Sequence, residues 1–118
     1  MIDLKFSYNW NHKLDCTAFT TIRLYNPQKH VKGNQVNIFL NDTPKGPGKI
    51  FDVVVFLLEN LNSFTSYLDT GYSVDQTKSI FRKIYPKVDF SLTRLALILV
   101  VKDPAEAKQK VEQKELFV

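Results

Sequence analysis

Two polar side chains in one expected strand have the chemistry to bind an anion or a base edge. Thr21 and Arg23 stand in the Thr- and Ile-rich stretch 18–24. Residues two apart in a strand point to the same face, so the Thr21 hydroxyl and the Arg23 guanidinium are expected side by side. The planar five-donor fork of arginine suits a phosphate or the acceptor edge of a nucleobase. The alternative for Arg23 is a structural ion pair with an acid such as Asp15.

Aromatic and basic side chains in expected loops add further candidate contacts. An indole or phenol ring there can stack on a base, or can instead cover an end of the fold. The Gly- and Pro-rich stretch 45–49 lacks the Walker pattern, and its prolines remove amide donors, so we interpret it as a tight hairpin loop. The candidate ligand contacts are Trp10, Lys13, Thr21, Arg23, Tyr25, Lys45, Lys49 and Tyr72.

The sulfur and imidazole groups do not form a recognisable site. His12 stands four residues before the lone Cys16, without a strained elbow or a third orienting group. We therefore interpret Cys16 as a buried, inert thiol. His12 and His30 lack the spacing of zinc ligands, and we predict neither a metal nor a cofactor.

Length and composition indicate one small domain. The chain has 118 residues, of which 44% are hydrophobic and 24% charged, enough for a single compact core. One cysteine allows no intrachain disulfide, and the N-terminus does not resemble a signal peptide. The longest apolar run, 95–101, is too short to span a membrane. We expect a cytoplasmic protein that does not associate with membranes.

The net charge of +4 is concentrated in the first fifty residues, which hold seven Lys or Arg and three acids. The rest of the chain is balanced. A basic half is compatible with a phosphate-bearing partner, although this charge also suits solubility alone.

Hydrophobic periodicity predicts strands at 4–8, 18–24, 36–40 and 50–58, with a loop at 41–48 and the fourth strand buried on both faces. Asn60 is expected to cap a short helix that buries Leu61, Phe64, Tyr67 and Leu68 and stops at Gly71. A capping box formed by Ser73 and Gln76 begins a second helix with a buried stripe of Val74, Thr77, Ile80, Phe81 and Ile84. An apolar strand over 92–101 closes the core. This order predicts an α+β fold of about five strands, with two helices between the fourth and last strands.

The stretch Phe19-Thr20-Thr21-Ile22-Arg23, followed some sixty residues later by Lys83-Ile84-Tyr85-Pro86, resembles the ASCH group of the PUA-like superfamily over residues 2–102. It is most similar to small bacterial proteins that include an acetylcytidine amidohydrolase. The resemblance implies a mixed β-barrel at 1–102 that binds RNA or a nucleoside. Beyond it, Asp103-Pro104-Ala105-Glu106, with proline at the first helical position, predicts a helical tail at 103–118.

The carry-over of site residues from that family is partial. Its signature threonine and arginine match Thr21 and Arg23, but its glycine and catalytic lysine fall on Cys16 and Ala18. Its glutamate falls on Gln76, a residue that cannot exchange a proton near neutral pH. We therefore expect a non-catalytic RNA- or nucleoside-binding module. The alternative is an amidohydrolase of acylated nucleosides that uses Thr21 and Lys13.

The end of the chain suggests a protein partner as a third possibility. Gln113, Leu116 and Phe117 form a Gln-x-x-Leu-Phe pattern that resembles peptides that bind the bacterial sliding clamp. The chain would then act as a protein-interaction adaptor. Docking of Leu116 and Phe117 onto the protein's own barrel, or chance, are the alternatives.

Overall fold

A computed structural model describes residues 1–102, so the predicted tail with Gln113, Leu116 and Phe117 lies outside the described residues. The elements, in chain order, are β1 (Ile2–Phe6), the 3-10 helix η1 (Trp10–Asp15), β2 (Ala18–Leu24), β3 (Gln35–Leu40), β4 (Thr43–Phe56), the 3-10 helix η2 (Leu58–Asn60), α1 (Ser63–Thr70), α2 (Val74–Ile84) and β5 (Leu95–Lys102).

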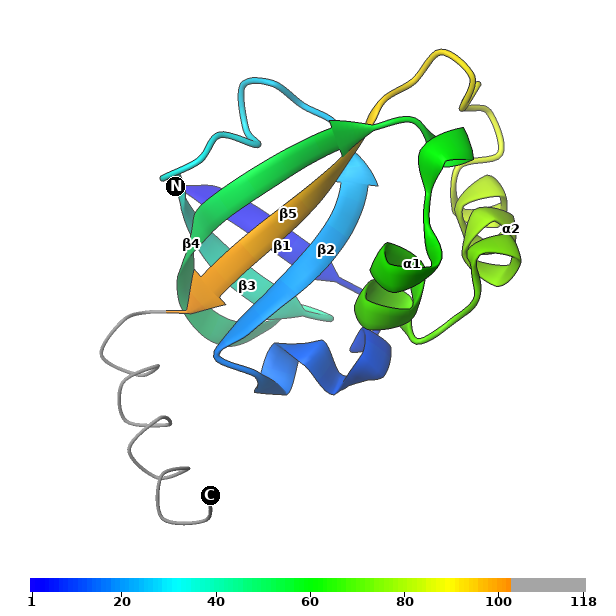
Figure 1. Ribbon diagram of the computed structural model, residues 1–118. Helices are drawn as coiled ribbons and strands as arrows, with labels where there is room; N and C mark the ends of the chain where they lie inside the picture. The colour runs from blue at the N-terminus through cyan, green and yellow to red at the C-terminus, as the bar shows by residue number, and fades with distance from the viewer. Residues whose placement is uncertain (103–118) are drawn as a thin grey trace.

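The strands form one mixed sheet in the order β1-β3-β4-β5-β2. Only β1 and β3 are parallel; the other neighbours are antiparallel. The sheet curls into a half-barrel that brings its two edge strands, β1 and β2, toward each other, and α1 and α2 lie beside β2 (Figure 1). The predicted α+β architecture, with both helices between the fourth and last strands, is confirmed at this level.

Alternation along β5 creates two apolar clusters, one on each face of the sheet. Ala96, Ile98 and Val100 are fully buried inside the half-barrel. Leu95 and Leu97 face the other way, toward the layer that contains Phe81 of α2. The central position of β5, between β4 and β2, explains why its sequence is apolar on both faces.

The predicted loop at 41–48 is wrong, because β4 already begins at Thr43. The turn between β3 and β4 consists of Asn41 and Asp42, both with positive φ. Pro44 and Pro47 are tolerated within the strand because only β3 lies beside this half of β4, which leaves their ring nitrogens free to face outward. The tight hairpin loop expected at 45–49 is therefore wrong as well.

The predicted burial of 50–58 on both faces is also wrong. The side chains of Phe51 and Val54 are 58% and 55% exposed. This half of β4 pairs with β5 but not with β3, so it forms an edge of the sheet rather than its centre.

Helix α1 inverts the burial pattern expected from its sequence. It buries Ser66, Asp69 and Thr70, while Phe64 and Leu68 are 82% and 72% exposed. Its N-cap is Asn62 rather than Asn60, and Gly71 ends it with φ 81°, as predicted. The predicted capping box of α2 is confirmed, and of its expected stripe only Ile84 is exposed. The first strand ends at Phe6, two residues earlier than expected.

Candidate functional site

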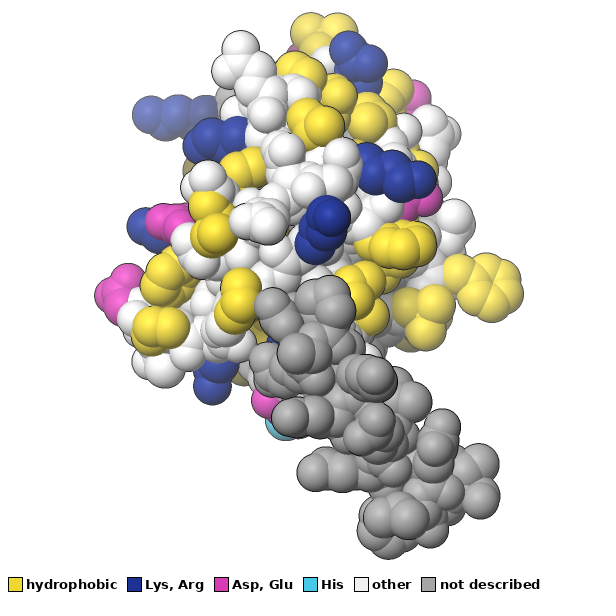
Figure 2. All heavy atoms as spheres, turned by 90° about the vertical axis from the view of Figure 1, so that its left-hand side faces the viewer, with side chains coloured by type: hydrophobic (Ala, Val, Ile, Leu, Met, Phe, Trp, Pro, Cys, Tyr) yellow, Lys and Arg dark blue, Asp and Glu magenta, His cyan; other side chains and the backbone are white. Residues whose placement is uncertain are grey.

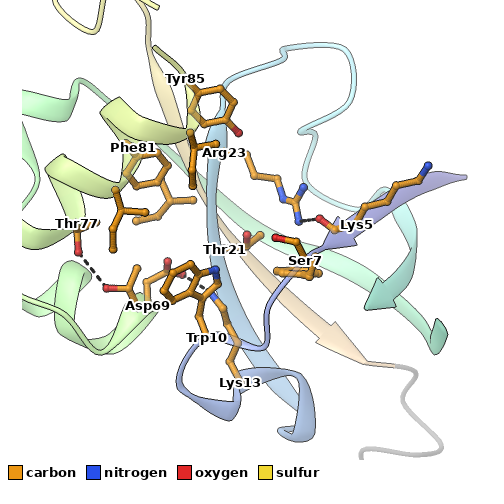
Figure 3. A pocket seen from close by; sticks show the side chains of 15 residues that line it. Lys5, Ser7, Trp10, Lys13, Thr21, Arg23, Asp69, Thr77, Phe81 and Tyr85 are labelled. Atoms are coloured by element: carbon orange, nitrogen blue, oxygen red, sulfur yellow. Dashed lines mark hydrogen bonds and ion pairs between the residues drawn. The ribbon is translucent and has the colours of Figure 1, made fainter. Parts of the chain in front are cut away.

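A pocket of about 170 Å³ lies at the open side of the half-barrel. It is bordered by the end of β1, by β2, by η1 and by the two α-helices. Arg23 and Tyr85 lie toward one end of it, Trp10, Lys13 and Asp69 toward the other, and Thr21 between them (Figure 3). Its lining includes three basic side chains and one acid: Lys5, Lys13, Arg23 and Asp69. The pocket is therefore net positive and favours an anionic or electron-rich ligand.

Arg23 joins the two edge strands of the sheet. Its Nη2 donates to the Lys5 carbonyl oxygen at 2.9 Å, and its guanidinium lies 4.6 Å from the centre of the Phe6 ring. Burial lowers the pKa of Arg23. The buried Nε has no hydrogen-bond partner among the described residues, which costs about 1–3 kcal/mol unless an acceptor reaches it. Arg23 thus bonds a backbone carbonyl of β1, rather than forming the ion pair with Asp15 that was considered as the alternative.

A buried ion pair forms the floor of the pocket. Lys13 Nζ donates to Asp69 Oδ1 at 2.9 Å and to the Thr20 carbonyl oxygen at 2.7 Å, and the Thr20 hydroxyl donates to the same carboxylate oxygen at 2.9 Å. The side chains of Lys13 and Asp69 are 8% and 5% exposed. Burial lowers the pKa of Lys13, against the smaller opposing effect of Asp69.

The local structure of η1 places Lys13 there. Asn11 and His12 have left-handed backbone angles, with φ of 55° and 54°, so the chain turns sharply before Lys13. The side chain of Asn9 accepts the Leu14 N–H at 2.9 Å, and Leu14 is buried in the core below. The left-handed turn and the buried Leu14 together direct Lys13 toward α1.

A hydroxyl network joins the two helices next to Asp69. Ser66 Oγ lies 2.6 Å from Thr77 Oγ1, which in turn lies 3.0 Å from Thr70 Oγ1. Thr70 also donates to the Ser66 carbonyl oxygen at 2.8 Å. All three residues are buried, so directional bonds fix the register of α1 against α2.

Thr21 offers a hydroxyl to the pocket. It is 4% exposed and lines the pocket, and no hydrogen bond joins its side chain to another described residue. Trp10 lines the same pocket and packs edge-on against Tyr8 and Tyr72, at centroid distances of 4.8 and 5.8 Å. Thr21, Arg23, Lys13 and Trp10 are therefore brought together, whereas Tyr72 contacts Trp10 but does not line the pocket.

The other candidate contacts lie elsewhere. Tyr25 packs against the interior cluster, with Arg94 5.9 Å from its ring. Lys45 stands on the half of β4 paired with β3, and Lys49 borders a different hollow beside Lys32. Figure 2 shows one face of the molecule on which Lys and Arg side chains are spread among apolar ones rather than gathered in one patch.

The interpretation of one reactive residue changes. Cys16 is exposed, so the expectation of a buried thiol is wrong: it follows η1 at the surface, just before β2 begins. Gln76 serves in the capping box, where it accepts the Ser73 N–H at 3.1 Å, and it is not among the residues that line the pocket. Asp69 was not identified from the sequence, because its position before Thr70-Gly71 was interpreted only as a helix end.

The comparisons with known proteins give no relative. No family model, no curated protein and no solved structure matches this chain. Among residues 1–102, no group of three or more His, Cys, Asp or Glu side chains is placed to hold a metal ion, and no helix is long and apolar enough to cross a membrane.

Proposed function

We propose that this chain is a PUA-like protein of the ASCH kind whose pocket binds one nucleoside, either free or as an unpaired residue of RNA. The observation that carries the proposal is the convergence of the Arg23 guanidinium, the Thr21 hydroxyl and the Trp10 indole on one pocket. These groups supply a hydrogen-bond fork for a base or phosphate, a further donor or acceptor, and an aromatic surface for stacking.

The size of the pocket supports a single nucleoside as the occupant. At about 170 Å³ it is smaller than the clefts that enclose drug-sized ligands, which begin at about 300 Å³. One base fits such a space only when it is free or splayed out of a strand. The excess of basic side chains at the rim and floor favours a phosphate beside the base.

The single tryptophan makes this proposal testable, since Trp10 is the only one in the chain and lines the pocket. Its fluorescence is expected to change on titration with cytidine, with cytidine monophosphate and with single-stranded RNA. Binding of the two phosphate-bearing ligands should weaken with salt, whereas binding of cytidine should not.

Matched variants separate ligand contact from folding. Thr21→Val removes the pocket hydroxyl at constant volume and should weaken binding about tenfold, corresponding to one hydrogen bond. Arg23→Lys keeps the charge but loses the fork and should weaken it further. No fluorescence change with any of the three ligands, in a folded protein, would overturn the proposal.

Amide hydrolysis of an acylated nucleoside is a second candidate, favoured by the buried Lys13 beside Thr21. Burial lowers the pKa of Lys13, which is the direction that a general base toward a hydroxyl nucleophile requires. Turnover of acetylcytidine that is lost in Thr21→Val and retained in Thr20→Ser would support hydrolysis. An absence of turnover at high enzyme concentration, with binding intact, would leave the binding function alone.

A further inference from the structure

The C-terminal half of β4 has an outer edge that no described strand covers. Strand β3 pairs with β4 only between Thr43 and Lys49, whereas β5 follows β4 as far as Phe56. Ile50 makes the last contacts on the outer side, donating its N–H to the Asn34 carbonyl and accepting the Gly33 N–H, both at 2.8 Å. Figure 1 shows the upper half of β4 with β5 on one side and no strand on the other.

The backbone groups on this edge can be assigned from one side-chain contact. Asp52 Oδ1 accepts the N–H of Val53 at 2.9 Å, so this N–H is directed away from β5. Backbone groups alternate between the two sides of a strand, which puts the N–H and C=O of Val55 on the same outer edge. Val55 therefore presents a donor and an acceptor to a further strand, whereas Val53 presents its C=O and an N–H that must exchange Asp52 Oδ1 for a carbonyl of that strand.

The side chains along this edge favour strand pairing. The segment 51–56 reads Phe-Asp-Val-Val-Val-Phe and contains one charge, no lysine and no proline, although such residues commonly guard exposed edges. Phe51, Val54 and Val55 are 58%, 55% and 38% exposed. Beside Val54 and Phe56 lies a hollow of about 90 Å³, which is also lined by Leu97 of β5, by residues 60–62 and by Thr65 of α1.

We propose that this edge of β4 pairs antiparallel with the same edge of a second copy of the chain, with the twofold axis at Val54. In this register Val53 of each copy faces Val55 of the other, and each pair exchanges its outward N–H and C=O groups. The result is a sheet that continues across both copies.

The charge pattern favours a second copy as the occupant. The twofold register sets each Asp52 opposite Phe56 of the other copy, so the two carboxylates do not face each other. The exposed Val54 side chains meet at the axis, next to the apolar hollow. Because only about five residues on each side pair, we expect a weak dimer whose population rises with protein concentration.

Sedimentation equilibrium of the full chain, from low micromolar to several hundred micromolar, tests this proposal. The wild type is expected to pass from monomer to dimer. Val54→Lys places two ammonium groups opposite each other, where like charges repel, and should be monomeric throughout. Leu68→Lys adds the same charge at an exposed apolar position on α1 and should dimerise like the wild type.

Cross-linking tests the register independently of affinity. Val54 and its twofold mate would form a non-hydrogen-bonded pair with Cα atoms about 4.5 Å apart, within reach of a disulfide. A Cys16→Ser, Val54→Cys variant should therefore oxidise to a covalent dimer, whereas Cys16→Ser, Leu68→Cys should not. A wild type that stays monomeric, or dimers lost in Leu68→Lys but kept in Val54→Lys, would overturn the proposal.

Discussion

The interior of the half-barrel and the junction of η1 with the two α-helices are buried by different means. The interior cluster is formed by apolar side chains such as Val36, Ile38 and Ile98, each 1% exposed or less. The junction buries an ion pair and three hydroxyls, while the large apolar residues of α1 face outward. Burial of apolar surface is non-directional, whereas hydrogen bonds fix positions and angles. The pocket borders the junction, where hydrogen bonds fix the positions of the side chains.

This difference implies that the junction specifies a site at some expense in stability. A buried ion pair is often no more stabilising than an apolar pair of the same volume, because both ions lose their hydration. Removing one partner is worse, since it leaves the other charge uncompensated. The predictions below test this contrast.

The largest effect is expected from Asp69→Ala. The variant leaves the buried Lys13 ammonium without its carboxylate, and we expect the free energy of unfolding to fall by about 3–5 kcal/mol. Urea denaturation measures this. The double variant Lys13→Met, Asp69→Leu should regain most of the loss, and a loss in Asp69→Ala below about 1 kcal/mol would mean that water screens the pair.

A smaller loss is expected from Thr77→Val, which preserves shape but removes the hydroxyl shared by Ser66 and Thr70. We expect a cost of about 1–3 kcal/mol, because buried polar groups lose a partner. Thermal unfolding monitored by circular dichroism would measure it. Ligand affinity should fall as well, since α1 carries Asp69, so a destabilised variant with unchanged affinity would uncouple the network from the site.

In the interior, Ile98→Val should cost about 0.5–1.5 kcal/mol, the amount for one buried methylene. Because Ile98 does not line the pocket, ligand affinity should stay unchanged. The same denaturation and fluorescence titrations apply. An affinity loss as large as that of Thr77→Val would contradict the separation between the two regions.

The smallest effect concerns pH and His30. Burial and the nearby charges of Arg23 and Lys29 lower its pKa, and its Nδ1 accepts the Asn26 N–H at 3.0 Å in the neutral form. Because the pKa of His30 is lower in the folded chain than in the unfolded chain, the unfolded chain binds more protons as the pH falls. The contribution of neutral His30 to the free energy of unfolding is therefore complete above pH 6.5 and decreases as the pH falls through the pKa of the folded chain. His30→Gln should flatten this part of the stability profile. An identical acid dependence in both proteins would refute the assignment.

Local signals predicted the parts of the fold that depend on neighbouring residues. The Gly71 stop, the Ser73 capping box and the strands β2 and β5 follow from patterns only a few residues long. The start of β4 does not follow from such a pattern, because Pro44 and Gly48 indicate a loop. Only pairing with β3 makes this segment a strand. A side chain at Gly48 would approach Val100 and Ile38 to 3.1 and 3.3 Å, so close packing rather than turn chemistry requires this glycine.

The candidate site was only half predictable for the same reason. Thr21 and Arg23 share a strand face, and period-two alternation places them together. The pairing of Lys13 with Asp69 joins residues 56 positions apart and depends on the left-handed kink of η1. The polar inner face of α1 was not predicted, because Phe64 and Leu68 were expected to be buried. Tertiary hydrogen bonds instead turn the polar face of the helix inward and leave these two side chains exposed.

The most direct test of the central claim is a two-dimensional ¹⁵N–¹H NMR titration with cytidine monophosphate. It would detect the indole N–H of Trp10 and the buried Nε–H of Arg23 separately from the backbone amides. We predict that these two signals and the amide of Thr21 shift together and saturate at a single affinity. Shifts confined to the surface around Lys45 and Lys49, with those of Trp10 and Arg23 unmoved, would contradict a nucleoside pocket between β1 and β2.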